Sequence, residues 1–165
     1  FKSDIKLAKT FFGIGFDIHQ LIKGKKLYLG GLNVPFHSGL KGHSDGDVII
    51  HSIIDALLGA MRKKDIGTLF PDNKKKFKNI RSPKMLKPVI QIMDKNKFYI
   101  NNLDINLICE QPKVSKYRDK IIKSLSKLLN IDSSLINLKG KTVEKLGLIG
   151  KEKAIACEVI CSISQ

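Results

Sequence analysis

The pattern of apolar and polar positions predicts strands and helices along the whole chain. Segment 48–64 is apolar on nearly every side and follows Asp47, whose side chain can accept hydrogen bonds from free backbone amides, so we expect a buried helix there. A second helix is expected over 82–96, with Pro83 at its first position. A third is expected over 113–130, where isoleucine and leucine recur at helical spacing.

Strands are expected where apolar residues alternate or flank glycines. They are 12–18, 25–36 (an extended pair broken by two glycines), 102–110, 134–143 and 153–163. The order of elements predicts an α+β two-layer sandwich, in which a mainly four-stranded, ferredoxin-like sheet carries helices on one face. A chain of 165 residues fits one domain, 1–165. The sheet face that carries no helices must be covered by another surface, often that of a partner subunit.

The charge narrows the choice of partners. The formal net charge is +15, yet only three of the 30 basic residues are arginine. Arginine is the usual reader of bases and phosphates, so the lysines indicate a solvated surface and a general attraction for a small anionic substrate, rather than nucleic-acid binding. No apolar run approaches the ~20 residues that span a bilayer. The three cysteines lack metal-ligand spacing and indicate reduced, buried thiols.

Candidate chemistry gathers in "HSDGDVIIHSIID", which holds two of the four histidines. His51 and Asp55 lie on one polar stripe of the expected helix, and His43 precedes that helix, so the two histidines have different roles. The stripe indicates a functional site or, alternatively, a core histidine paired with an aspartate.

The motif "GFDIH" offers partners for His51. Asp17 and His19 stand two apart on an expected strand and project from one face. With His51 they form an Asp-His-His set, and three such ligands with an open fourth position are typical of catalytic zinc. The alternative is that His19 packs in the core and Asp17 acts as a cap.

Two loops carry further polar groups. Segment 63–73 can present carboxylates and backbone to polyol hydroxyls, or can be an ordinary turn. In "KGKTVEKLG", Lys141 and Thr142 suit phosphate and Glu144 suits a hard divalent cation, although a plain charged turn is the alternative.

Four segments in fixed order resemble one family: "GIGFDIH", "HSDGDVIIHSIIDALLGAMRKKDIGTLFPD", "EQPKV" and "KTVEKLGLIGKEKAIACEV". From Phe12 to its end the chain resembles the 2-C-methyl-D-erythritol 2,4-cyclodiphosphate synthases of the non-mevalonate isoprenoid pathway. The resemblance implies a homotrimer with active sites at the subunit interfaces. It also implies a lyase that takes a cytidine diphosphate substrate, 4-diphosphocytidyl-2-C-methyl-D-erythritol 2-phosphate, whose 2-phosphate attacks the β-phosphate and releases CMP.

The resemblance also implies roles for residues. Zinc (Zn2+) would be held by Asp17, His19 and His51, and a second cation, Mg2+ or Mn2+, by Glu144; His43 and Thr142 would be catalytic hydrogen-bond donors. Substrate-binding residues would be Ser44, Asp65, Ile66, Gly67, Phe70, Pro71, Asp72, Asn73 and Lys74. Nucleotide-binding residues would be Cys109, Pro112, Lys113, Val114, Lys141, Thr142, Val143, Leu148 and Lys151.

The chain departs from the family pattern at Lys141, Val143, Leu148 and Lys151, which puts nucleotide affinity in question. A zinc-dependent phosphohydrolase acting on a nucleotide diphosphate is the alternative function, because Asp-His-His sites also serve hydrolysis. The chain begins at Phe1 and is rich in lysine, asparagine and isoleucine. We therefore expect a plastid or apicoplast enzyme whose targeting segment has been removed, with bacterial cytoplasm as the alternative.

Overall fold

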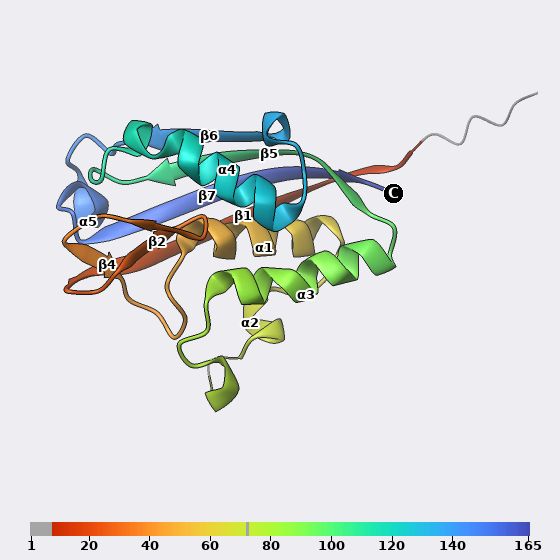
Figure 1. The fold of residues 1–165 in the computed structure, drawn as a ribbon, viewed down its shortest axis with the longest axis horizontal. Helices are drawn as coiled ribbons and strands as arrows, with labels where there is room; N and C mark the ends of the chain where they lie inside the picture. Colours follow the sequence, from red (N-terminus) through yellow and green to blue (C-terminus); the bar gives the residue numbers. More distant parts are fainter. Residues whose placement is uncertain (1–7, 72) are drawn as a thin grey trace, which may run out of the picture.

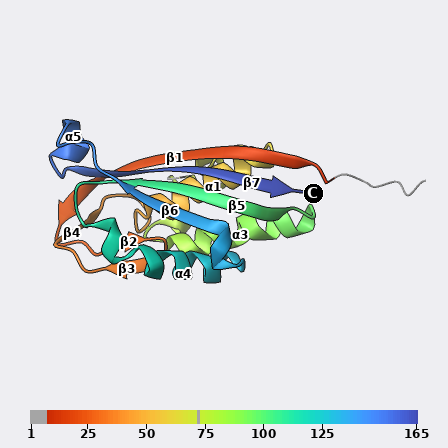
Figure 2. The same cartoon turned by 90° about the horizontal axis from the view of Figure 1, so that it is seen from above.

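The computed structural model describes residues 8–71 and 73–165, which form a mixed five-stranded sheet with helices packed against one face (Figures 1 and 2). The strand order is β4-β1-β7-β5-β6. The strands are β1 Thr10–Lys23, β4 Ser38–Leu40, β5 Tyr99–Ile108, β6 Ile136–Lys141 and β7 Ala154–Ser164. A separate hairpin is formed by β2 Leu27–Leu29 and β3 Leu32–Val34.

The α+β class is confirmed, and the strand count needs correction. The expected four strands are present as β1, β5, β6 and β7, and the three-residue strand β4 adds a fifth at the edge. Strand β7 pairs antiparallel with both β1 and β5, whereas β6 runs parallel to β5. Strands β6 and β7 follow each other in the sequence but do not pair, because β5 lies between them in the sheet.

Five α-helical segments lie among the described residues: α1 Val48–Ala60, α2 Ile66–Leu69, α3 Ser82–Lys95, α4 Arg118–Leu129 and α5 Gly147–Gly150. Helix α1 ends earlier than expected, since Arg62 has a positive φ of 57°. Helix α4 starts later, because a separate 3-10 turn occupies Val114–Lys116. Pro83 is second rather than first in α3. None of the described helices is long and apolar enough to span a bilayer.

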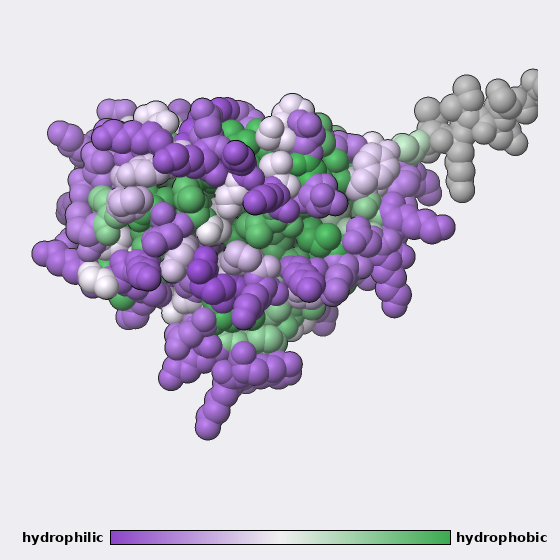
Figure 3. Space-filling view, viewed as in Figure 1, coloured by the Kyte–Doolittle hydropathy of each residue, from purple (hydrophilic) through white to green (hydrophobic). Residues whose placement is uncertain are grey.

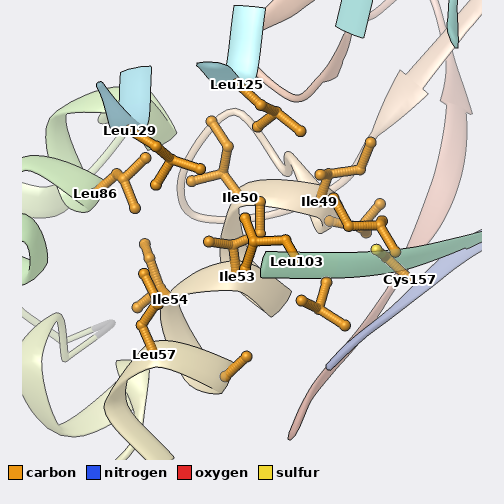
Figure 4. Close-up of a cluster of buried hydrophobic side chains, with 14 of the residues drawn as sticks. Ile49, Ile50, Ile53, Ile54, Leu57, Leu86, Leu103, Leu125, Leu129 and Cys157 are labelled. Atoms are coloured by element: carbon orange, nitrogen blue, oxygen red, sulfur yellow. The ribbon is translucent and has the colours of Figure 1, made fainter. Parts of the chain in front are cut away.

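Helix α1 forms the centre of the core. It contacts β1 and β7 on one side and α3 on another, and it is therefore apolar nearly all round. Figure 4 shows Ile49, Ile50 and Ile53 among side chains from β5, α3 and α4. The three cysteines are unpaired and buried, as expected.

Asp47 links the start of α1 to the β2–β3 hairpin through hydrogen bonds to both. It is fully buried and caps the helix through the amides of Ile49 and Ile50, at 3.2 and 3.1 Å. The same carboxylate accepts from the amides of Gly30 and Gly31, at 2.9 and 2.7 Å. The expected cap is confirmed, and it also holds a turn in which both glycines have positive φ.

Asp47→Ala is expected to lower the free energy of unfolding by about 3 kcal/mol or more, because several buried amides lose their acceptor at once. Urea denaturation followed by circular dichroism measures the change. The matched control is Asp132→Ala, which removes an exposed cap on the amide of Ser134 and should change stability little. Equal, small effects of the two substitutions would contradict the role given to Asp47.

Candidate functional site

Strand β1 and helix α1 approach each other unusually closely. Residues Gly13, Gly15, Asp17 and His19 alternate toward the helix, while the residues between them face outward. A Cβ atom at Gly15 would lie 1.8 Å from the carbonyl oxygen of Ser52. The missing side chains let the helix lie directly on the strand, which places His51 over the Asp17–His19 pair.

Asp17, His19 and His51 converge on one point, as predicted. Asp17 Oδ2 lies 2.7 Å from His19 Nε2 and 2.9 Å from His51 Nδ1, and the two ring nitrogens are 3.2 Å apart. One ligand atom from each residue falls within 4.8 Å of the others. The side chains are 25%, 21% and 10% exposed, so an ion there would be reachable from solvent on one side only. One carboxylate and two imidazoles fit a metal ion with an open position.

The three side chains are coupled electrostatically. Burial raises the pKa of Asp17, but hydrogen bonds from His19 and His51 outweigh it and hold that pKa well below its ordinary value. Burial lowers the pKa of His51, but the hydrogen bond with Asp17 and its negative charge outweigh it and raise that pKa above its ordinary value. In the metal-free protein, His51 therefore holds a proton more firmly than a free imidazole does.

Metal affinity is expected to fall steeply as the pH is lowered from about 8 to about 6, because the ion must displace the proton from His51. Below the raised pKa of His51, each pH unit should cost up to about tenfold in affinity for one displaced proton. Competition titrations against a chromogenic chelator across this range measure the effect. A pH-independent affinity would contradict the coupling.

The other ring nitrogen of His51 faces a buried polar network. His51 Nε2 lies 3.0 Å from Ser82 Oγ and 3.1 Å from Ser44 Oγ. Ser82 donates its hydroxyl hydrogen to Asp45 Oδ1, and Asp45 Oδ2 accepts from the amide of Ser82 at 3.0 Å and from Arg81 Nε at 2.8 Å. No local pattern indicates Ser82 and Asp45, because Ser82 reaches His51, and Asp45 reaches Ser82, only in the folded chain.

A cavity of about 360 Å³ opens above the cluster. Its predicted lining residues include His43 and Ser44, which lie before α1, and Ile66, Gly67 and Phe70 of the segment around α2. Five further lining residues were not expected: Phe16, Gly42, Phe77, Ile80 and Met85. Most of these residues are apolar, and an apolar residue in the sequence indicates packing rather than a role in a cavity.

The loop around α2 is held in place by two carboxylates. Asp55 accepts from the amide of Ile66 at 2.7 Å, and Asp65 caps α2 through the amide and hydroxyl of Thr68, at 2.9 and 2.8 Å. Asp65 does not line the cavity. The same is true of Pro71, Asn73 and Lys74, and Asp72 lies outside the described residues.

A second cavity, of about 240 Å³, lies where β5 and β6 end. Six of the predicted nucleotide-binding residues line it: Cys109, Pro112, Lys113, Val114, Lys141 and Thr142. Arg118 and Gly140 also line it and were not expected. Val143, Glu144, Leu148 and Lys151 lie outside its lining, although Thr142 Oγ1 donates to Glu144 Oε1 at 3.3 Å.

Glu110 shapes the loop beside the second cavity. Its Oε1 accepts from the amides of Val143 and Lys145, both at 3.1 Å. Glu144 and Lys145 have positive φ values of 53° and 61°, so the chain turns sharply here. This carboxylate therefore holds the turn that carries Thr142 and Glu144.

Known proteins resemble this chain in sequence and in fold. The chain is 54% identical over 162 residues to a bifunctional enzyme IspD/IspF of Pelagibacter ubique, covering 98% of this chain but only 44% of that relative. It is 42% identical to the 2-C-methyl-D-erythritol 2,4-cyclodiphosphate synthase of Caldicellulosiruptor bescii, covering 93% of this chain and 98% of that one. The solved CDP complex of Plasmodium falciparum IspF superposes with a TM-score of 0.83 at 42% identity, over 96% and 98% of the two chains.

A family model, described as the YgbB family, matches residues 10–164. That match takes in both cavities and the whole Asp17, His19 and His51 cluster. The chain therefore belongs to the YgbB family, with 2-C-methyl-D-erythritol 2,4-cyclodiphosphate synthases among its relatives.

Proposed function

We propose that this chain converts 4-diphosphocytidyl-2-C-methyl-D-erythritol 2-phosphate into the cyclic 2,4-diphosphate and CMP. The observation that carries the proposal is the Asp17, His19 and His51 cluster beneath a cavity in a chain of this family. In the reaction, an oxygen of the 2-phosphate forms a bond to the β-phosphorus, and the bond from that phosphorus to the bridging oxygen of CMP breaks. The attacking phosphate is already an anion near neutral pH, so no side chain has to act as a base.

The chain has to align two anionic groups and stabilise charge at phosphorus. Asp17, His19 and His51 would hold zinc, which supplies Lewis-acid stabilisation of phosphate oxygens when bound. Ser44 Oγ accepts from the amide of Gly46 at 3.2 Å and lies 3.1 Å from His51 Nε2, so its hydroxyl hydrogen can go to a phosphate oxygen when Nε2 carries the imidazole hydrogen. The imidazole of His43 is exposed at the cavity and suits the same role.

The second cavity suits the cytidine nucleotide. Lys113 and Lys141 bring positive charge to it, and Thr142 brings a hydroxyl. Glu144 is an exposed carboxylate beside Thr142 and would hold Mg2+ or Mn2+, ions that are commonly bound through one or two carboxylates together with substrate phosphates. The solved relative in complex with CDP supports a cytidine nucleotide at this fold.

We infer a homotrimer whose active sites lie between subunits. The outward face of β1 and β7 is apolar, with Phe12, Ile14, Phe16, Ile18 and Ile160 exposed by 72%, 64%, 56%, 44% and 51%. Elsewhere hydrophilic side chains cover much of the view in Figure 3. A row of large apolar side chains of this kind marks an interface. The two cavities share no lining residue within one chain. In the trimer we infer, the cavity over the Asp17, His19 and His51 cluster of one subunit would meet the second cavity of the next.

Ile14→Asp tests the assembly. Sedimentation should show three copies of 18.5 kDa for the parent chain and a monomer without cyclisation activity for the variant. Ile160 stands opposite Ile14 on β7, so Ile160→Asp provides an independent second disruption of the same face. A monomeric, fully active chain would refute the trimer.

The reaction is tested by phosphorus NMR of the product formed from the cytidine substrate. The proposal expects a cyclic diphosphate together with one equivalent of CMP. A linear product would instead indicate the zinc-dependent phosphohydrolase, which needs an activated water. The plastid or apicoplast location stays a prediction, as does the alternative of bacterial cytoplasm.

A further inference from the structure

The two ring nitrogens of His51 face different groups, and this decides whether the residue can bind a metal ion. Nδ1 points at Asp17 and His19, whereas Nε2 points at the hydroxyls of Ser82 and Ser44. A neutral imidazole carries its hydrogen on only one nitrogen. Nδ1 can donate its lone pair to an ion only in the form that keeps the hydrogen on Nε2.

The network behind Nε2 provides an acceptor for the hydrogen of that form. Asp45 is 6% exposed and accepts from Arg81 Nε and from the amide and hydroxyl of Ser82. The guanidinium carbon of Arg81 lies 3.7 Å from the centre of the Tyr28 ring, and its Nε lies 2.8 Å from Asp45 Oδ2, so Arg81 is held beside the carboxyl group. A carboxylate only accepts, so the single hydroxyl hydrogen of Ser82 is committed to Asp45. The oxygen of Ser82 is then left to accept a hydrogen from His51 Nε2.

We propose that Asp45 and Ser82 are positioning residues that hold His51 with hydrogen on Nε2 and its Nδ1 lone pair directed at the metal position. The inference rests on the proposed metal site formed by Asp17, His19 and His51. It assigns Ser82, at the start of α3, and Asp45, before α1, to one chain of hydrogen bonds that ends at a metal ligand. Groups in this position commonly change metal affinity about 10- to 100-fold.

Asp45→Asn gives the sharpest test. The side-chain oxygen of the new asparagine can keep the bonds from Arg81 Nε and from the backbone N–H of Ser82. Its side-chain nitrogen then faces the Ser82 hydroxyl and can only donate to it. Ser82 would have to turn its hydrogen toward His51 Nε2 and so force the hydrogen of His51 onto Nδ1. Ser82→Ala removes the link without reversing it. We expect both variants to bind zinc about 10- to 100-fold more weakly in chelator competition, with Asp45→Asn the weaker.

Ser52→Ala is the matched control. Ser52 is as buried as Ser82 and is adjacent to His51, but it donates to the carbonyl oxygen of Cys157 at 3.0 Å. Its loss should lower the melting temperature and leave zinc affinity unchanged. A similar loss of affinity in Ser52→Ala, or parent-like affinity in both Asp45→Asn and Ser82→Ala, would overturn the proposal.

Nitrogen NMR of the histidines in the zinc-loaded protein gives a second readout. With zinc on Nδ1, we expect the hydrogen of His51 on Nε2, with a nitrogen shift typical of a hydrogen-bonded imidazole in the parent and in Ser52→Ala, and a changed shift in Ser82→Ala. The same His51 Nε2 shift in the parent and in Ser82→Ala would refute the inference. These readouts need no turnover, so they do not depend on whether the product is cyclic. A linear product would overturn the proposed reaction and leave this inference standing. Absence of zinc binding by the parent would overturn both the metal site and this inference.

Discussion

His51→Ala is expected to remove bound zinc and to lower the rate of CMP release by at least about 10²- to 10³-fold. His51 offers one of the three atoms proposed as zinc ligands, and the other two come from β1. Asp17→Asn should have a similar effect, because it removes the negative charge that both histidines contact at 2.7 and 2.9 Å. Metal analysis of the purified protein together with a CMP-release assay measures both effects.

His37→Ala is the matched control for this substitution. His37 is an exposed histidine that contacts the hydroxyl of its neighbour Ser38 at 2.8 Å and does not line the cavity over Asp17, His19 and His51. Its substitution should leave zinc content and turnover at parent levels. A His51→Ala protein that lacks zinc but retains full activity would contradict the proposed mechanism.

The periodicity of strands and helices was enough to predict the positions of Asp17, His19 and His51 relative to their own strand or helix. The two-residue spacing of Asp17 and His19 placed both on one face of β1, and the polar position of His51 in an apolar helix placed it toward them. Asp47 was predicted as a cap because capping depends on the next few residues only. These features follow from backbone periodicity, which a single sequence displays directly.

Features that depend on distant segments were not predictable in the same way. The short edge strand β4 has only three residues, too few for a recognisable alternation. Arg118 lines the second cavity because α4 begins beside β6, where Arg118 Nε donates to Leu138 O at 2.9 Å. Ser82 reaches His51 only because α3 packs against α1. In each case, tertiary packing sets the contact.

Gly15→Ala is expected to damage the fold and the metal site together. The added Cβ would lie 1.8 Å from the oxygen and 2.8 Å from the carbonyl carbon of Ser52. These are backbone atoms and cannot rotate away, so α1 must move off β1. We expect a loss of about 3 kcal/mol or more in unfolding free energy, at the upper end of overpacking costs.

The same displacement carries His51 away from Asp17 and His19, since His51 directly precedes Ser52 on the helix. Zinc affinity should therefore fall along with stability in Gly15→Ala. Gly59→Ala is the matched control. A Cβ atom at Gly59 would lie 3.9 Å from the carbonyl oxygen of Ile14, which is an ordinary contact. Because alanine favours a helix more than glycine does, the free energy of unfolding should rise by about 0.5–1 kcal/mol, and zinc affinity should not change. If Gly15→Ala matched Gly59→Ala in both measurements, close packing of α1 on β1 would not be what brings the three ligands together.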